Sequence, residues 1–454
     1  MSFPAYPDYK HSGVEWANEL PAHWRTVALK WVSRIYAGGT PDKNKTYYWE
    51  NGSIPWLNSG AVNQVLISEP SSYITTEAFS SSSARWIPAG SLVIALAGQG
   101  KTKGMVAQLA IKTTCNQSMA AIVPDLSMVS RYLFWWLSSN YQNIRNMAGG
   151  DHRDGLNLEL IGNIAALLPT EAEQTQIARF LDHETARIDA LIEEQQRLIE
   201  LLKEKRQAVI SHAVTKGLDP TVPMKDSGVE WLGEVPAHWV VSKFGYISSV
   251  VRGGSPRPAG DPELFNGDFS PWVTVAEITK DDEIYLEETE TFLTKKGSDQ
   301  CRIFSKGTLL LSNSGATLGV PKILMINANA NDGVVGFENI SLDREYSYFY
   351  LSTLTQGLRK RAAGSGQPNL NTDIVKSIDV PIPPSNEVAE ILVAVRKLRA
   401  QFHLLSKEAA DGVRLLQERR SALISAAVTG KIDVRGWQPP VSTQAPKSEA
   451  AEAV

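Results

Sequence analysis

Apolar residues recur at alternating steps of four and three along residues 171–212, a stretch without glycine or proline. This spacing predicts an amphipathic helix with a heptad seam, and a stretch near the end of the chain repeats it with a few polar interruptions. The expected seam residues are Ile177, Leu181, Ile188, Leu191, Leu198, Leu202 and Val209, then Ile391, Val395, Leu398, Phe402, Leu405, Leu416 and Leu423. The preferred interpretation is that the two helices, each about 60 Å long at 1.5 Å per residue, pair antiparallel as a spacer. The alternative is that each helix packs only on its own domain.

The residues before each helix follow a different pattern. Short apolar runs such as Ser91–Leu96 are bounded by glycine and proline, which predicts mixed strands and loops. The expected fold class is therefore α+β, with two mixed α/β domains separated by two long antiparallel coiled-coil helices. The expected divisions are a first domain at 1–170, a first spacer helix at 171–216, a second domain at 217–385, a second spacer helix at 386–432 and a disordered tail at 437–454.

Three short motifs of the first half recur 215 residues later. They are SGVEW at Ser12–Trp16 and Ser227–Trp231, PAHW at Pro21–Trp24 and Pro236–Trp239, and GGTP or GGSP at Gly38–Pro41 and Gly253–Pro256. The register persists to the end of each copy, where AVT at Ala213–Thr215 returns as Ala427–Thr429. The period is too long for a solenoid, so the pattern predicts a tandem pair of domains with pseudo-two-fold symmetry.

Composition narrows the class of protein. A chain of 454 residues with 43% hydrophobic residues can form more than one packed core. We expect a cytoplasmic protein, because no signal peptide or membrane-length apolar run is visible and Cys115 and Cys301 cannot form a disulfide framework. The net charge of −4 is unusual for a nucleic-acid binder. The acidic residues gather in 281–290, so DNA binding would have to be local or shared with a more basic partner.

The repeated motifs resemble those of a known family, the specificity subunits of type I restriction-modification enzymes. The segments that carry the resemblance are Asp226–Trp239, Gln367–Asn371 leading into Val380–Pro384, and Ile424–Val434. The resemblance covers residues 8–436 in order and in both copies. One departure is that the first copy has GDHRDG at Gly150–Gly155 where the second has GQPN at Gly366–Asn369, so equivalent loops are expected to read different bases.

The resemblance implies a non-catalytic subunit with two target-recognition domains, each reading one half of an interrupted, asymmetric DNA site. It also implies two methyltransferase subunits docked on the spacer, and restriction subunits added to that core. No cofactor is expected on this chain, because S-adenosylmethionine, ATP and magnesium would be bound by the partner subunits. In this view the helix pair fixes the distance between two half-sites, each gripped in the major groove.

Two features of the sequence could indicate catalysis instead. Ala95–Thr102 matches a permissive P-loop pattern, but a glycine-broken, β-like segment follows it where a phosphate-binding helix is needed. A strand–turn–strand whose tip points at DNA is the favoured interpretation. No motif for gripping a flipped adenine is present, and the acidic run at 281–290 lacks the partners of a nuclease metal site, so a solvated face is favoured there. His23 and His238, in the repeated PAHW motif, are expected to cap or pack a domain.

Recognition of DNA needs side chains with paired donors and acceptors, supported by cations and hydroxyls on phosphate. The candidate residues in the first copy are Lys43, Asn44, Lys45, Gln99, Lys101, Lys103, His152 and Arg153. Those in the second copy are Arg252, Arg257, Asn313, Ser314, Thr317, Arg359, Lys360, Arg361, Gln367 and Asn369. A solvated surface role is the alternative for each of them. For the whole chain, the alternatives are a coiled-coil scaffold without a DNA role and a self-sufficient methyltransferase or nucleotide hydrolase.

Overall fold

The computed structural model describes residues 3–98, 100–147, 155–315, 317–362 and 369–440. The chain forms two compact units. The first unit joins residues 1–195 to residues 411–454, and the second unit is the continuous stretch 196–410. The first unit is therefore built from both ends of the chain, whereas the second is built from its middle.

The first unit is organised around a five-stranded sheet. Its strand order is β4 (Ser33–Ala37), β11 (Met119–Pro124), β8 (Leu92–Ala95), β9 (Val106–Leu109) and β6 (Leu66–Ile67). Smaller sheets join β10 (Thr114–Cys115), β5 (Ile54–Leu57) and β7 (Ser72–Ile74), then β1 (Tyr9–Val14) and β2 (Ala17–Pro21), then β12 (Ala165–Leu168) and β3 (Arg25–Ala28). The helices are η1 (Leu29–Trp31), η2 (Thr46–Tyr48), η3 (Ser59–Asn63), α1 (Thr76–Ser80), α2 (Ser130–Ser139), α3 (Tyr141–Asn146) and α4 (Leu158–Asn163). Alternate residues of β8 point to different cores, which buries the strand on both faces.

The second unit repeats this plan. Its five-stranded sheet has the order β16 (Ser249–Arg252), β24 (Val334–Glu338), β21 (Leu309–Ser312), β22 (Pro321–Leu324) and β18 (Tyr285–Leu286). Smaller sheets join β19 (Phe292–Leu293), β17 (Ser270–Val273), β23 (Ala328–Ala330) and β20 (Ile303–Phe304), then β13 (Met224–Asp226) and β14 (Glu234–Pro236), then β15 (Val240–Lys243) and β25 (Asp379–Ile382). The helices are α6 (Phe244–Ile247), α7 (Pro262–Phe265), α8 (Val275–Thr279), α9 (Lys295–Ser298), α10 (Arg344–Ala362) and α11 (Thr372–Lys376). The matching strand orders confirm the duplication that the repeated motifs predict.

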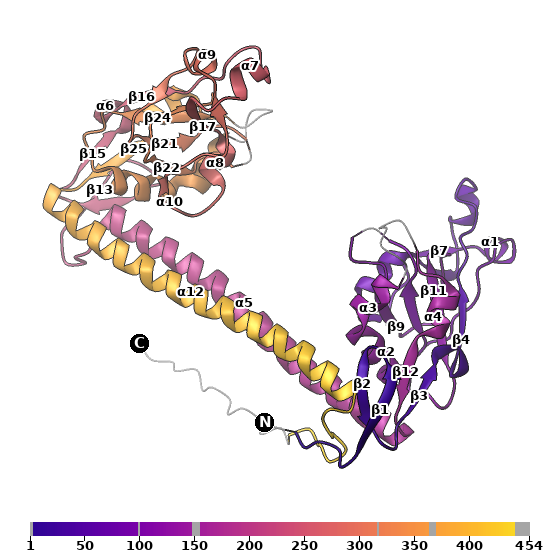
Figure 1. The fold of residues 1–454 in the computed structure, drawn as a ribbon. Helices are drawn as coiled ribbons and strands as arrows, with labels where there is room; N and C mark the ends of the chain where they lie inside the picture. The colour runs from indigo at the N-terminus through magenta and orange to yellow at the C-terminus, as the bar shows by residue number, and fades with distance from the viewer. Residues whose placement is uncertain (1–2, 99, 148–154, 316, 363–368, 441–454) are drawn as a thin grey trace. The chain divides into compact units, whose positions relative to one another are not determined.

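Two long helices, α5 (Glu171–Lys216) and α12 (Ser385–Val428), contribute to both units (Figure 1). In the first unit, Ile177 of α5 and Val428 of α12 belong to one core cluster, and Asp189 pairs with Arg420 at 2.7 Å. Residue numbers thus rise along α5 while they fall along α12, so the helices are antiparallel, as expected. The second unit likewise joins Val214 and Ile391 in one core. α12 ends four residues before the expected boundary at 432.

The seam differs from the expected one at three positions. Leu191, Leu198 and Leu405 are 43%, 42% and 47% exposed, so their assignment to the seam is wrong. Ile192 and Ile199, one residue further along α5, are half-buried in their place. A straight helix turns once every 3.6 residues, so a strict heptad stripe drifts around it and a neighbouring row takes over. The other expected seam residues are buried or half-buried.

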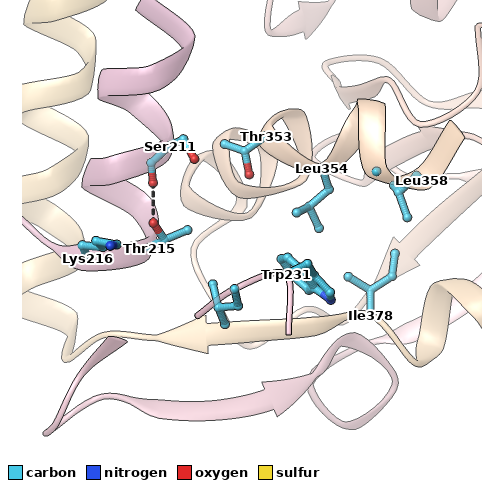
Figure 2. A pocket seen from close by; sticks show the side chains of 10 residues that line it. Ser211, Thr215, Lys216, Trp231, Thr353, Leu354, Leu358 and Ile378 are labelled. Atoms are coloured by element: carbon cyan, nitrogen blue, oxygen red, sulfur yellow. Dashed lines mark hydrogen bonds between the residues drawn. The ribbon is translucent and has the colours of Figure 1, made fainter. Parts of the chain in front are cut away.

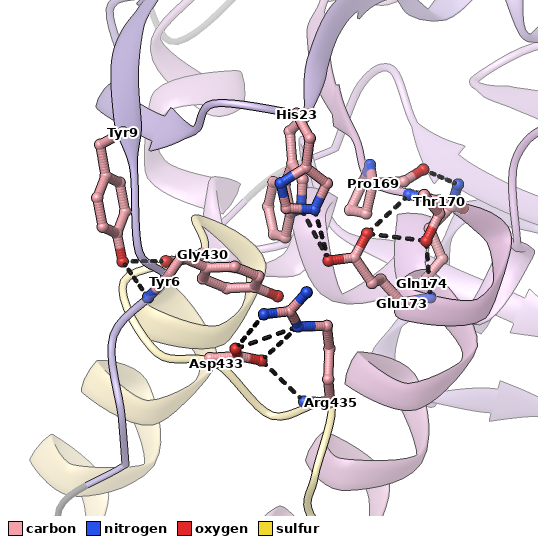
Figure 3. A network of polar contacts seen from close by, with 11 residues as sticks. Tyr6, Tyr9, His23, Pro169, Thr170, Glu173, Gln174, Gly430, Asp433 and Arg435 are labelled. Carbon is pink, nitrogen blue, oxygen red and sulfur yellow. Dashed lines mark hydrogen bonds and ion pairs between the residues drawn. The ribbon is translucent and has the colours of Figure 1, made fainter.

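The start of α5 is held by the repeated PAHW motif (Figure 3). His23 Nε2 lies 2.8 Å from Glu173 Oε1, and Trp24 Nε1 donates to the same oxygen at 3.3 Å. Thr170 and Glu173 also bond reciprocally at the helix N-terminus. Burial alone would raise the pKa of Glu173, but the hydrogen bonds from His23, Thr170 and Trp24 outweigh it and hold the pKa below its usual value. The expected packing role of His23 is confirmed.

Residues after α12 close the first unit against its own N-terminal segment. Asp433 N donates to Pro4 O at 2.7 Å, and the Arg435 guanidinium lies 4.9 Å from the ring centre of Tyr6 (Figure 3). Trp437 packs on Phe180 with ring centres 5.3 Å apart. Trp437 therefore belongs to the packed structure, although the disordered tail was expected to begin there. Residues 441–454 lie outside the described residues.

Candidate nucleic-acid interface

Three connections of the first unit meet at one end of its five-stranded sheet. β4 and β8 both end there and the antiparallel β11 begins there, so the residues after β4, after β8 and before β11 must lie together. Gly38 N donates to Met119 O at 3.1 Å, and Leu96 N donates to Ser118 O at 2.8 Å. Leu156 N donates to Leu96 O, which brings a fourth segment to the same place. We call this end of the sheet the loop rim.

The second unit has a loop rim built by the same bonds. Gly253 N donates to Val334 O at 2.9 Å, and Asn313 N donates to Gly333 O at 2.9 Å. Leu370 N donates to Asn313 O at 2.7 Å and takes the place that Leu156 has in the first unit. Equivalent backbone bonds therefore fix equivalent rims, while the side chains displayed on them differ.

The repeated GGTP/GGSP motif explains how each rim is packed. A Cβ on Gly38 would lie 2.1 Å from Cys115 O, and one on Gly253 would lie 2.3 Å from Asn331 O, so only glycine allows the two chain segments to approach. The hydroxyl that follows each glycine pair then reaches a side chain of the facing segment.

In the first unit Thr40 donates to Gln117 Oε1, and in the second Ser255 donates to Asp332 Oδ1 at 2.8 Å. The sequence-based candidates did not include Gln117 and Asp332. The repeated motif was a signal for a packed turn, but it did not reveal which residue would face the hydroxyl.

Several expected residues of the first unit lie on the loops that leave its rim. Lys43, Asn44, Lys45 and Lys101 are exposed on the two loops after β4 and β8. The Lys45 ammonium lies 3.2 Å from Tyr48 Oη, and this hydrogen bond raises the pKa of Lys45, which keeps it charged. Lys103 is only 6% exposed, so it is removed from the proposed contacts. Gln99, His152 and Arg153 lie outside the described residues.

In the second unit Arg252, Arg257, Thr317 and Asn369 are exposed on the segments that leave the rim, and Lys360 is exposed in the last turn of α10. Arg359 is exposed as well, and its Nε donates to Leu318 O at 3.1 Å. Ser314 is half-buried and pairs with Asn369 as a β-bridge.

Asn313 was a wrong choice for a base contact. It is fully buried, and its amide donates to Leu370 O at 3.2 Å, so the short polar side chain joins two segments beneath the rim. Gln367 and the side chain of Arg361 lie outside the described residues.

The segment that resembles a P-loop is part of a hairpin. β8 and β9 are adjacent antiparallel strands, and β21 and β22 are their counterparts in the second unit. The expected strand–turn–strand is thus confirmed. In the described residues no helix begins directly after this turn, so it lacks the helix N-terminus that holds phosphate in a P-loop.

The acidic run of the second unit is partly neutralised by cations of the same unit. Asp281 pairs with Lys322, whose side chain is only 1% exposed, and Asp282 lies 3.4 Å from Arg206 of α5. Burial would raise the pKa of Asp281, but the hydrogen bonds from Lys322 and from the Glu283 backbone amide, together with the charge of Lys322, outweigh it and lower the pKa. Within the described ranges no group of three or more His, Cys, Asp or Glu side chains is arranged to hold a metal ion.

A cavity of about 390 Å³ lies in the second unit between the end of α5, the loop that carries Trp231 and α10 (Figure 2). Its walls combine Trp231, Leu354 and Leu358 with the hydroxyl groups of Thr215 and Thr353. None of the described side chains that line it is a carboxylate, histidine or cysteine, so it offers no carboxylate or imidazole base and no thiol nucleophile. No helix in the described part of the chain is both long and apolar enough to cross a bilayer.

Comparison with known proteins adds to this geometry. A family model described as the type I restriction modification DNA specificity domain matches twice, over residues 21–202 and 236–410. The specificity subunit of the Escherichia coli type I restriction enzyme EcoR124I/EcoR124II is 30% identical over 40% of this chain and 46% of its own length. The MjaIX specificity subunit of Methanocaldococcus jannaschii is 30% identical over 35% and 38%. Both matches thus span less than half of those relatives.

Other relatives match along almost the whole chain. The EcoKI specificity subunit of Escherichia coli K12 is 21% identical over 93% of this chain and 92% of its own. Among solved structures, a chain of a type I R-M system aligns with a TM-score of 0.72 over 91% of this chain and 99% of its own. The HsdS subunit from Thermoanaerobacter tengcongensis aligns with a TM-score of 0.55 over 91% and 98%. Both structures are 16% identical to this chain and support the fold alone.

Proposed function

The chain belongs to the type I restriction modification DNA specificity family, and from that premise we propose that it is the DNA-reading subunit of a type I restriction-modification enzyme. Each unit would grip one half of a bipartite, asymmetric site. The observation that carries the proposal is the pair of loop rims, because the same backbone frame displays two different sets of polar side chains. Identical frames with different side chains suit the reading of two different short sequences.

The charges of the rims fit this role. Cations such as Lys43, Lys101, Arg252 and Arg257 are exposed there and can contact phosphate, which fixes register without reading sequence. The acidic Asp281 and Asp282 are engaged by Lys322 and Arg206, which reduces their repulsion of DNA. The overall charge of −4 still favours sharing of the DNA with more basic partners.

We further propose that the chain is non-catalytic and works with two methyltransferase subunits and with restriction subunits. S-adenosylmethionine, ATP and magnesium would then be bound by those partners. α5 and α12 would act as the spacer that sets the gap between the half-sites. This spacer role is supported by the continuity of the helices, because each one runs without a break from residues of one unit into residues of the other.

The test is selection of bound sequences from random DNA by the full chain together with its methyltransferase partner. We expect two short conserved half-sites separated by a fixed number of unspecified bases. A second complex would carry four additional residues after Gln195 and four after Ala410, which lengthens each helix by about 6 Å. The half-sites should be unchanged and the gap should grow by roughly two base pairs. Selection of no sequence, or of altered half-sites with an unchanged gap, would contradict the proposal.

A further inference from the structure

We propose that Gln117 in the first unit and Asp332 in the second are specificity-determining residues, each reading one base of its half-site. The inference rests on the proposed DNA-reading function and goes beyond it by assigning a base chemistry to each unit. Gln117 precedes β11 and Asp332 precedes β24, which are equivalent strands at the centre of each rim. The two residues are 215 positions apart, the same offset as the repeated motifs.

The loops that carry Gln117 and Asp332 are both held by the glycine pair of the repeated GGTP/GGSP motif. We call Gln117 and Asp332 the readers. Gly38 and Gly253 let the end of the strand approach the loop that carries the reader, because a Cβ at these positions would lie only 2.1 and 2.3 Å from backbone oxygens of that loop. Gly39 N then donates to Cys115 O at 2.8 Å, and Gly254 N donates to Ala330 O at 2.9 Å. The conformation of the reader loop is thus fixed by backbone bonds in both units.

The next residue along fixes the reader itself. Thr40 donates to Gln117 Oε1, and Ser255 donates to Asp332 Oδ1. A side chain that is already oriented loses less rotamer entropy on binding, so these hydroxyls improve discrimination without touching DNA. Thr40 and Ser255 are therefore positioning residues.

The two readers differ in hydrogen-bonding chemistry. An amide donates through its nitrogen and, because its oxygen has two lone pairs, Gln117 can still accept once while it is held by Thr40. Donor and acceptor together match the N7 and N6 edge of adenine in the major groove. An ionised carboxylate only accepts, and the edge that suits it is the N4 amino group of cytosine. We therefore assign adenine to Gln117 and cytosine to Asp332.

The surroundings of Asp332 support a base contact. A carboxylate on a DNA-binding surface is repelled by phosphate, so its place there is explained if it accepts a hydrogen bond from a base. Arg252 Nε donates to the backbone oxygen of Asp332 at 2.6 Å, which places a cation beside the carboxylate. Asp332 is half-buried rather than free in solvent, and Ser255 occupies one of its oxygens.

The experiment compares selected DNA sequences for the complete complex carrying Gln117→Glu or Asp332→Asn. Gln117→Glu removes the donor and should change the preferred base at one position of one half-site. Asp332→Asn adds a donor and should change one position of the other half-site. For each variant we expect the original base to lose its preference by roughly 5- to 150-fold. The rest of both half-sites and the gap should stay the same.

The controls are chosen from the same units. Gln64→Glu and Asp268→Asn make the same chemical changes at exposed positions outside the segments 115–118 and 330–333 that carry Gln117 and Asp332, and they should select the wild-type site. Thr40→Val and Ser255→Ala leave the readers in place, so they should keep the preferred base and weaken its preference. Gln117→Ala and Asp332→Ala should lose base preference only at the position assigned to each residue. These variants keep the test decisive if the charge change in Gln117→Glu or Asp332→Asn prevents DNA binding.

The outcomes separate this inference from the function on which it rests. If the wild-type complex selects a bipartite site and both readers can be changed without altering any base preference, the assignment is wrong. It is also wrong if Gln117 and Asp332 variants alter the same half-site, or if stably folded alanine variants lose all binding. If the wild-type complex selects no sequence, the proposed function itself fails.

Discussion

The two units hold the start of a long helix in the same way but complete the other end of the helix pair differently. His23 and Trp24 contact Glu173 in the first unit, and His238 and Trp239 contact Glu387 at 2.6 and 2.9 Å in the second. In the second unit the end of α5 runs on covalently through residues 217–223 into β13. In the first unit the end of α12 meets an N-terminal segment that is far away in the sequence, through Asp433 and Pro4. A noncovalent junction thus replaces a peptide linker.

The same comparison applies to charges. Arg131 of α2 pairs with Asp182 of α5 at 2.7 Å, and the equivalent pair of the second unit has the opposite polarity, with Glu345 of α10 and Arg396 of α12 also 2.7 Å apart. Lys322 of β22 is buried where the first unit has the buried Ala107 in β9. The duplicated backbone therefore fixes which positions are in contact, and each unit fills those positions with its own complementary side chains.

The largest effect on stability should come from breaking the Asp281–Lys322 ion pair of the second unit. Asp281→Asn leaves the Lys322 ammonium buried without its carboxylate, and we expect a loss of about 3 kcal/mol in the stability of that unit. Hydrogen exchange of β21 and β22 would measure it. Because the pKa of Asp281 is lowered, the stabilisation is present above about pH 4 and is lost as the pH falls through the lowered pKa.

The matched control for this pair is the double variant Asp281→Asn, Lys322→Met. It replaces the charge by an apolar side chain of similar length, so most of the lost stability should return. A single Asp281→Asn variant as stable as the wild type would show that the buried ammonium does not depend on Asp281.

The next effect concerns the noncovalent junction of the first unit. Trp437→Ala removes the packing on Phe180, and because Trp437 is only half-buried we expect a loss of about 2 kcal/mol, below the roughly 3–5 kcal/mol of a fully buried tryptophan. Hydrogen exchange should increase in residues 3–30 and 171–185, with no change in the second unit. A chain that ends after Pro440 keeps every described contact and is the control. Equal protection from hydrogen exchange in the Trp437→Ala variant and in the chain that ends after Pro440 would show that Trp437 does not hold the junction.

A smaller effect should follow from changing the carboxylate at the start of α5. Glu173→Gln weakens the bonds from His23 and Trp24, at a cost of about 1–2 kcal/mol at pH 7. The lowered pKa of Glu173 means that the wild-type stabilisation is present above about pH 4.5 and is lost as the pH falls through that lowered value. The variant should therefore lack this acid-dependent loss, as measured by denaturant unfolding from pH 3 to 7. An identical pH profile would refute the role of Glu173.

The smallest effect tests the reversed ion pairs. Arg131→Glu places two carboxylates together and should cost about 0.5–1 kcal/mol, because both partners are partly exposed and screened. The double variant Arg131→Glu, Asp182→Arg gives the first unit the polarity of the second and should restore part of the stability, because Asp182 Oδ1 also accepts a hydrogen bond from Trp135 Nε1 at 2.9 Å that the variant loses. Raising the salt concentration should narrow the difference between the single variant and the wild type. A double variant no more stable than the single one would count against the pairing.

Much of the fold could be predicted because it depends on patterns that the sequence displays directly. The fixed offset between repeated motifs predicted the duplication, and the stretch without glycine or proline predicted α5. The seam was less predictable, because an exposed Leu198 and a half-buried Ile199 fit nearly the same periodicity. Only the surface on which the helix packs decides between them.

The candidate site was predictable as a set of loops but not as a set of side chains. Charged residues in loops, such as Lys43 and Lys101, are exposed as expected, since burial of an unpaired charge is costly. Asn313 and Lys103 followed the same loop pattern but are buried, because segments distant in sequence cover them. Gln117 and Asp332 were missed for the same reason, since their partners Thr40 and Ser255 are 77 residues away.

The discontinuous make-up of the first unit has a consequence for biosynthesis. Residues 196–410 leave the ribosome as one uninterrupted piece, so the second unit can form its core while translation is still under way. The other core includes Ile424 and Val428, and Trp437 packs on its Phe180, so it must wait until these residues have been translated. Residues 1–195 are thus translated before the second unit but complete their core after it, and a product that terminates before Ile424 would contain one finished unit at most.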